Sequence, residues 1–118
     1  MATNYYLGTT TARQQVVTVT PANVEVGDIF RLTLTLDDSS VITITFTATA
    51  ATVANVTAGL TAAWNASLNP WVAAITAADN TTNLTLTADV AGVPFSLTTS
   101  TANGGAVDDQ TLTAVVTT

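Results

Sequence analysis

A strict alternation of apolar and polar residues between Asp28 and Ala48 constrains this chain more than any other feature. From Phe30 to Leu36 every second residue is apolar, and the residues between them are Arg31 and threonines. Four polar residues follow, and the alternation then resumes with isoleucines, a phenylalanine and threonines. Because successive side chains of a strand point to opposite faces, this stretch predicts a β-hairpin with one apolar face and one threonine face.

Similar alternation elsewhere predicts further strands, about seven in all. The expected strands are near 14–20, 29–36, 41–48, 71–78, 84–88, 94–100 and 110–117. One stretch instead has apolar residues at helical spacing, which predicts a helix over 52–66 with Thr49 or Thr52 as its N-cap. We therefore expect an α+β, mainly β fold: a sheet or two-layer sandwich with the helix packed on an apolar face.

Individual residues sharpen this expectation. Pro21 is expected to end the first strand, because proline cannot donate a backbone hydrogen bond. In the last strand, Leu112, Ala114 and Val116 are expected to point inward. Gly59 interrupts the predicted helix, which suggests close approach to a partner surface.

The two tryptophans carry different expectations. Trp64 lies on the apolar stripe of the predicted helix, together with Val53, Val56 and Leu60. That position assigns Trp64 to the core. Trp71 follows a proline, and its sequence position fits equally a cap on the core and an exposed contact for a partner.

The chain has 118 residues, which suits one domain. We expect this single β-rich domain over 14–118. Residues 1–13 lack a clear period and are expected to form an N-terminal arm, either frayed or lying on a neighbouring subunit. Tyr5, Tyr6 and Leu7 make a short apolar patch in that arm, and tyrosine offers a large contact area at small entropic cost.

Charged residues make up only 8% of the chain, and the net charge is −6. Arg13 and Arg31 are the only basic residues, so binding to nucleic acid or to an anionic membrane is not expected. Threonine supplies surface polarity instead, at 27 of 118 positions. Since the centres of protein interfaces are depleted in charge, such a surface suits burial in an assembly.

The sequence offers little for catalysis. It has no histidine, cysteine or lysine, so Ser/His and Cys/His arrangements are excluded, and we expect no enzyme and no cofactor. Paired carboxylates occur at Asp37–Asp38 and Asp108–Asp109, both in predicted turns, where aspartate is favoured for backbone hydrogen bonding. A calcium site in these turns is the functional alternative, although neither matches the regular calcium-loop pattern.

Several segments resemble a β-rich module of tail- and fibre-associated virion proteins of tailed bacteriophages, which also occurs in some repetitive bacterial surface proteins. The similar segments are 26–30, 45–60, 75–79, 84–88 and 91–97, and the resemblance spans roughly 15–116. It implies a structural, non-enzymatic role in an assembly and brings no catalytic residues with it.

The expected function is therefore a structural subunit of a bacteriophage virion, as a tail tube, decoration or fibre-associated protein. Its partners would be other copies of itself and other virion proteins, with Tyr5, Tyr6, Leu7, Arg13 and Trp71 as interface residues. The alternative is a subunit of an extracellular bacterial filament or adhesin, which should be made with a leader. The first residues lack signal-peptide features, and no run is long enough to span a membrane, which favours the virion. A third possibility is a carbohydrate- or calcium-binding β module.

Overall fold

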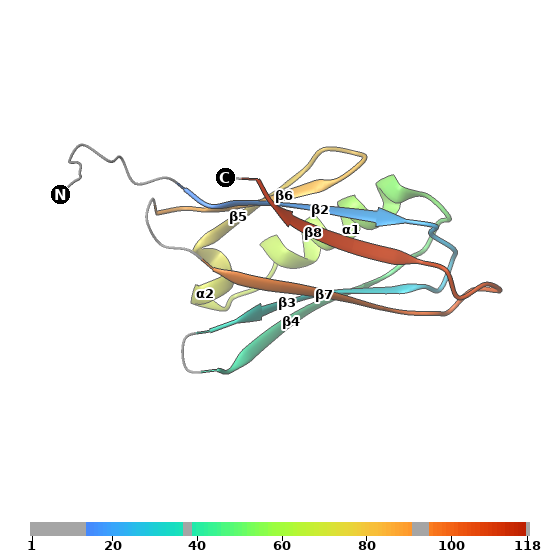
Figure 1. The fold of residues 1–118 in the computed structure, drawn as a ribbon, viewed down its shortest axis with the longest axis horizontal. Coiled ribbons are helices and arrows are strands. Elements are labelled where there is room, and N and C mark those ends of the chain that lie inside the picture. Colours follow the sequence, from blue (N-terminus) through green and yellow to red (C-terminus); the bar gives the residue numbers. More distant parts are fainter. Residues whose placement is uncertain (1–13, 37–38, 91–94, 118) are drawn as a thin grey trace.

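The computed structural model describes residues 14–36, 39–90 and 95–117, and within them the chain forms two antiparallel sheets and two helices (Figure 1). The strands are β2 (Val16–Ala22), β3 (Ile29–Thr35), β4 (Val41–Thr47), β5 (Ile75–Asp79), β6 (Leu84–Ala88), β7 (Ser96–Ala102) and β8 (Thr111–Val116). The helices are α1 (Val53–Asn65) and α2 (Pro70–Ala73). One sheet has the order β5-β6-β2-β8 and the other β4-β3-β7. The predicted mainly β fold with one long helix is confirmed.

The hairpin of β3 and β4 has the predicted two faces. Phe30 pairs with Phe46 and Leu32 with Ile44 on the inner face, where Phe30 and Leu32 are fully buried. On the outer face, Arg31 lies opposite Thr45. Residues 37 and 38 of the connecting loop are outside the described ranges.

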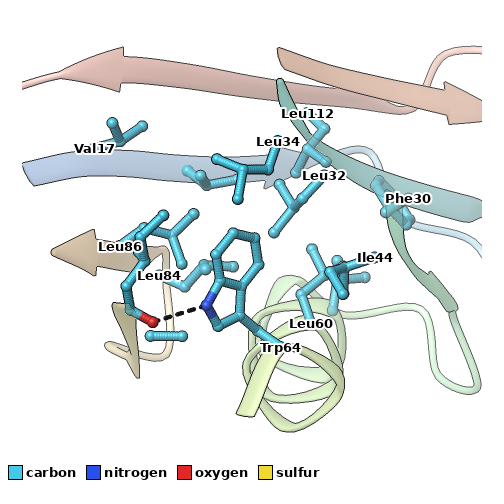
Figure 2. Close-up of a cluster of buried hydrophobic side chains, with 14 of the residues drawn as sticks. Val17, Phe30, Leu32, Leu34, Ile44, Leu60, Trp64, Leu84, Leu86 and Leu112 are labelled. Atoms are coloured by element: carbon cyan, nitrogen blue, oxygen red, sulfur yellow. Dashed lines mark hydrogen bonds between the residues drawn. The ribbon is translucent and has the colours of Figure 1, made fainter. Parts of the chain in front are cut away.

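The core lies between the two sheets, and α1 fills the side of the sandwich that adjoins β4 and β5. Trp64 projects from α1 into the centre of this core, among leucines from both sheets (Figure 2). Its indole Nε1–H donates a 2.9 Å hydrogen bond to the carbonyl oxygen of Ile75 in β5. The assignment of Trp64 to the core is confirmed.

The helix begins as predicted, because the Thr52 hydroxyl accepts a hydrogen bond from the backbone N–H of Asn55. Thr57 lies outside the apolar stripe of α1 and is nevertheless fully buried. Its hydroxyl donates to the carbonyl oxygens of Ala54 and Thr81, at 3.1 and 3.3 Å, so the buried polar group is satisfied. Gly59 does mark a close approach, but to the Phe46 ring of β4: an added Cβ would lie 2.3 Å from that ring.

The predicted strand over 71–78 is wrong in its first half. Residues 70–73 form α2, because Pro70 stands at its first position and the Asn69 side chain caps it by accepting from the Trp71 N–H at 2.9 Å. The strand β5 begins only at Ile75. The sequence alternation assigns Trp71 and Ala73 to one face of a strand. In the helix α2 it is instead Val72, between them, that is buried.

Pro21 does not end its strand, since β2 continues to Ala22. The carbonyl oxygen of Gln15 accepts a hydrogen bond from the backbone N–H of Ala88 in β6. Because hydrogen-bonded positions alternate along an antiparallel strand, the backbone groups of the odd-numbered residues of β2 point toward β6. The pairing with β6 stops at Val19, so the missing N–H of Pro21 costs no ladder bond.

Val116 has the inward parity of Leu112 in β8, but it is not part of the core as expected, because it is 63% exposed. Leu112 lies beside β7, where the Thr99 hydroxyl donates to its carbonyl oxygen, and it is buried as expected. Val116 lies four residues further along β8, at the end of the sandwich where β7 begins. The alternation correctly gives the face of the sheet on which Val116 lies. Its side chain is exposed because no described residue covers that end of the sheet.

Candidate self-association surfaces

The outer face of the sheet β4-β3-β7 is coated with hydroxyl groups. Its side chains stand in rows across the three strands, because the pairing register aligns residues of the same face. The four rows are Val41–Thr35–Ser96, Thr43–Thr33–Thr98, Thr45–Arg31–Ser100 and Thr47–Ile29–Ala102. Arg31, on the central strand, is the only charged residue in the three described strands of this face.

The outer face of the sheet β5-β6-β2-β8 carries no charged strand residue. It is formed by Val16, Thr18, Thr20, Ala22, Thr76, Ala78, Thr85, Thr87, Thr111, Thr113 and Val115. Covering this face with another protein surface would remove mainly hydroxyl and methyl groups from water, with the Asp89 carboxylate beside Thr76 as the charge nearest to it. The desolvation cost is correspondingly small.

The described carboxylates lie in the loops and at the ends of strands, and among them Asp89, just after β6, reaches an outer face by accepting a hydrogen bond from Thr76. They belong to Glu25, Asp28, Asp79, Asp89, Asp108 and Asp109. The negative net charge is thus displaced from the sheet faces toward the connections between strands. Both flat faces are left nearly neutral, which is the arrangement expected of surfaces that meet other protein.

Three of the four sheet edges are covered within the subunit. At β5, α1 lies alongside, and Trp64 donates to the Ile75 carbonyl oxygen. The edges of β7 and β8 face one another, and the hydroxyls of Thr99 and Thr101 donate to carbonyl oxygens of Leu112 and Gln110, at 2.6 and 3.5 Å. The helix α1 also packs beside β4, but no hydrogen bond from a described side chain reaches the outer edge of that strand.

Asp28 is a buried carboxylate that joins two loops, and the sequence pattern did not single it out. Its Oδ2 accepts from the Glu25 N–H at 2.9 Å, and its Oδ1 accepts from the N–H groups of Gly104 and Gly105 at 3.0 and 3.1 Å. The hydrogen bond from the Gly104 N–H is the largest cause that lowers the pKa of Asp28, and the bonds from Glu25 and Gly105 lower it further. Burial of the carboxylate raises the pKa, but the net effect is a lowering. The Glu25 side chain extends the junction by accepting from the Val107 N–H.

Because the folded-state pKa of Asp28 is lowered, this carboxylate stabilises the fold above its ordinary pKa of 3.8. The contribution should disappear as pH falls through the lower folded pKa. Asp28→Asn is expected to destabilise the protein at pH 7 and to flatten the acid limb of its stability curve, measured by urea unfolding between pH 7 and pH 2. Asp109→Asn, at an exposed loop residue, is the control. An acid limb equally steep in Asp28→Asn and wild type would contradict this role.

The residues predicted for the interface are not brought together in the described structure. Tyr5, Tyr6, Leu7 and Arg13 lie outside the described residues. Trp71 lies on α2 and is 59% exposed, so its side chain is available to a partner rather than a cap on the core.

The described residues contain no group of three or more His, Cys, Asp or Glu side chains that could hold a metal ion. Of the two predicted carboxylate pairs, Asp37–Asp38 lies outside the described ranges, and Asp108 accepts a hydrogen bond from the Gln110 side chain at 3.0 Å. A hollow of about 200 Å³ beside α2 is lined by residues including Trp64, Val72 and Ile75, and by no titratable group.

No helix within the described ranges is long and apolar enough to cross a membrane. Comparison of the chain with models of known protein families, with curated proteins and with solved structures found no match.

Proposed function

We propose that this protein is a non-enzymatic structural subunit of a bacteriophage virion and assembles by self-association. The observation that carries the proposal is the near absence of charge from the outer faces of both sheets, where threonine and serine hydroxyls replace the usual charged side chains. The assignment to a virion is supported by the resemblance of the sequence to tail- and fibre-associated modules.

Self-association explains this surface better than a small-molecule or ion site would. A ligand site needs a few converging polar or charged groups in a hollow, whereas these hydroxyls are spread evenly over two flat faces. Extended, weakly polar surfaces instead suit contact with another extended surface. Other copies of the chain and other virion proteins are therefore the proposed partners.

The experiment is a mass measurement on the full chain by light scattering and sedimentation over a wide concentration range. The proposal expects particles whose mass is a multiple of the 12.0 kDa subunit. Mass spectrometry of purified tailed-phage particles and of cell-surface filaments from the source then separates a virion from an extracellular filament. A protein that stays monomeric at high concentration and is missing from phage particles would overturn the proposal.

A further inference from the structure

The outer edge of β4 exposes a complete set of backbone hydrogen-bonding groups. The Ala48 N–H donates to the Asp28 carbonyl at 2.8 Å, and the Leu36 N–H donates to the Ser40 carbonyl at 2.9 Å. In an antiparallel ladder this means that the even-numbered residues of β4 bond to β3. The N–H and C=O groups of the odd-numbered residues therefore point away from the sheet. These are Val41, Thr43, Thr45 and Thr47, and all four residues are exposed.

This edge lacks the features that usually prevent edge-to-edge pairing. The seven residues of β4 include no charge and no proline. The pairing with β3 runs without interruption from Ile29 opposite Thr47 to Thr35 opposite Val41, so no bulge bends the strand. An unprotected edge of this length is a template for another strand.

We propose that β4 pairs with β4 of a second copy, antiparallel and about a two-fold axis at Ile44, joining two three-stranded sheets into one of six strands. The inference rests on the proposed self-association and specifies its surface. In this register Thr43 lies opposite Thr45 of the partner subunit, and Val41 lies opposite Thr47 of the partner subunit. All four outward residues of each strand then form hydrogen-bonded pairs.

The side chains of β4 are self-complementary in this register. On the outer face Thr43 meets Thr45 of the partner subunit, and Val41 meets Thr47 of the partner subunit, so the uncharged surface continues across the pair of subunits. On the inner face Ile44 meets Ile44 of the partner subunit, and Ile42 meets Phe46 of the partner subunit. Ile42 and Phe46 are only half-buried in the single subunit, so pairing would cover apolar surface that one copy leaves open. A shift by one residue would place threonine against isoleucine and lose this match.

The neighbouring helix α1 is uncharged and exposes small residues. Because α1 contacts both β4 and β5, it lies on the side of the sandwich toward which the β4 edge points. The exposed residues of α1 include Ala54, Ala58 and Ala62, one turn apart, and α1 contains no charged residue. No charge on this helix opposes the approach of the partner subunit.

Cross-linking tests the register directly, because the chain has no cysteine of its own. Thr43→Cys and Thr45→Cys, prepared separately and mixed before oxidation, should form a disulfide between subunits. Residues of a hydrogen-bonded antiparallel pair have Cα atoms about 5.5 Å apart, within disulfide range. Each variant oxidised alone should cross-link far less, since its cysteines are offset by two residues. Thr98→Cys, on the same face but on β7, is the control and should give no dimer with either variant.

A proline substitution tests the edge without disturbing the sheet. Because the Thr45 N–H points outward, Thr45→Pro removes no hydrogen bond to β3 but blocks a second strand. We expect it to raise the dissociation constant of the pair at least about tenfold, while Thr45→Ala leaves it nearly unchanged. Circular dichroism checks that both variants fold.

The outcomes separate the two proposals. If the wild-type protein assembles but the mixed cysteine variants give no more dimer than each alone, and Thr45→Pro assembles normally, the β4 pairing is wrong and self-association stands. If the wild-type protein does not assemble at all, both fail.

Discussion

Replacing Trp64 with alanine is expected to lower the free energy of unfolding by about 3–5 kcal/mol. Trp64 is 1% exposed and is the largest fully buried side chain of the core. It reaches from α1 to leucines of both sheets, so its removal leaves a cavity where three layers of structure meet (Figure 2). The substitution also leaves the Ile75 carbonyl oxygen without the indole donor.

Trp71→Ala is the matched control for this prediction. It makes the same chemical change on an exposed residue of α2, and a change within about 0.5 kcal/mol is expected. Urea unfolding followed by far-ultraviolet circular dichroism measures both variants, because fluorescence would change with the tryptophan content itself. Similar losses in the two variants would contradict the central role of Trp64.

Trp64→Phe covers the case in which the alanine variant does not fold. It retains an aromatic ring but removes the N–H that donates to Ile75. A loss of about 1–3 kcal/mol is expected, between the wild type and the alanine variant. Wild-type stability in Trp64→Phe would show that the hydrogen bond contributes nothing measurable.

Gly104→Ala is expected to destabilise the protein by about 3 kcal/mol, at the upper end of the cost of overpacking. An added Cβ would lie 1.9 Å from the carbonyl oxygen of Gly27 and 2.4 Å from its carbonyl carbon. Both are backbone atoms, and Gly27 is held at a φ of +95°, so a small side-chain rotation cannot relieve the overlap. The loop must move away, which breaks the bond from the Gly104 N–H to Asp28.

Val107→Ala is the control in the same loop. Val107 is exposed, and the contact that it makes to Glu25 uses its backbone N–H, which alanine retains. Thermal and urea unfolding should show a near-neutral effect. The double variant Gly104→Ala with Asp28→Asn should lose less than the sum of the single losses, because both changes break the same junction. Full additivity would mean that the two residues act independently.

The strands and their buried faces were predictable because alternation is a local property. Each apolar residue at every second position of β3, β4 and β6 lies on the inner face, as the pattern indicates. The pattern failed where burial depends on a neighbour far along the chain. Thr57 is buried because the loop at Thr81 covers it, and Val116 is exposed because no strand extends over it.

The candidate assembly surface could be predicted only in part. The hydroxyl-rich, nearly uncharged character of the outer faces follows from the sequence, because threonine alternates with apolar residues along each strand. The open edge does not, since β4 and β7 have similar threonine-rich patterns and both lie at an edge of the same sheet. Within the described ranges, hydrogen bonds join β7 to β8 and α1 to β5, and none reaches the outer edge of β4.

The sequence by itself thus determined which side chains of each strand face the core and which face outward, because the pleat of a strand follows from its backbone geometry alone. The tertiary structure decided which strand lies at an open edge and which carboxylate is buried between loops. Those depend on the order of the strands and on contacts between residues as far apart as Asp28 and Gly104, which no local pattern encodes.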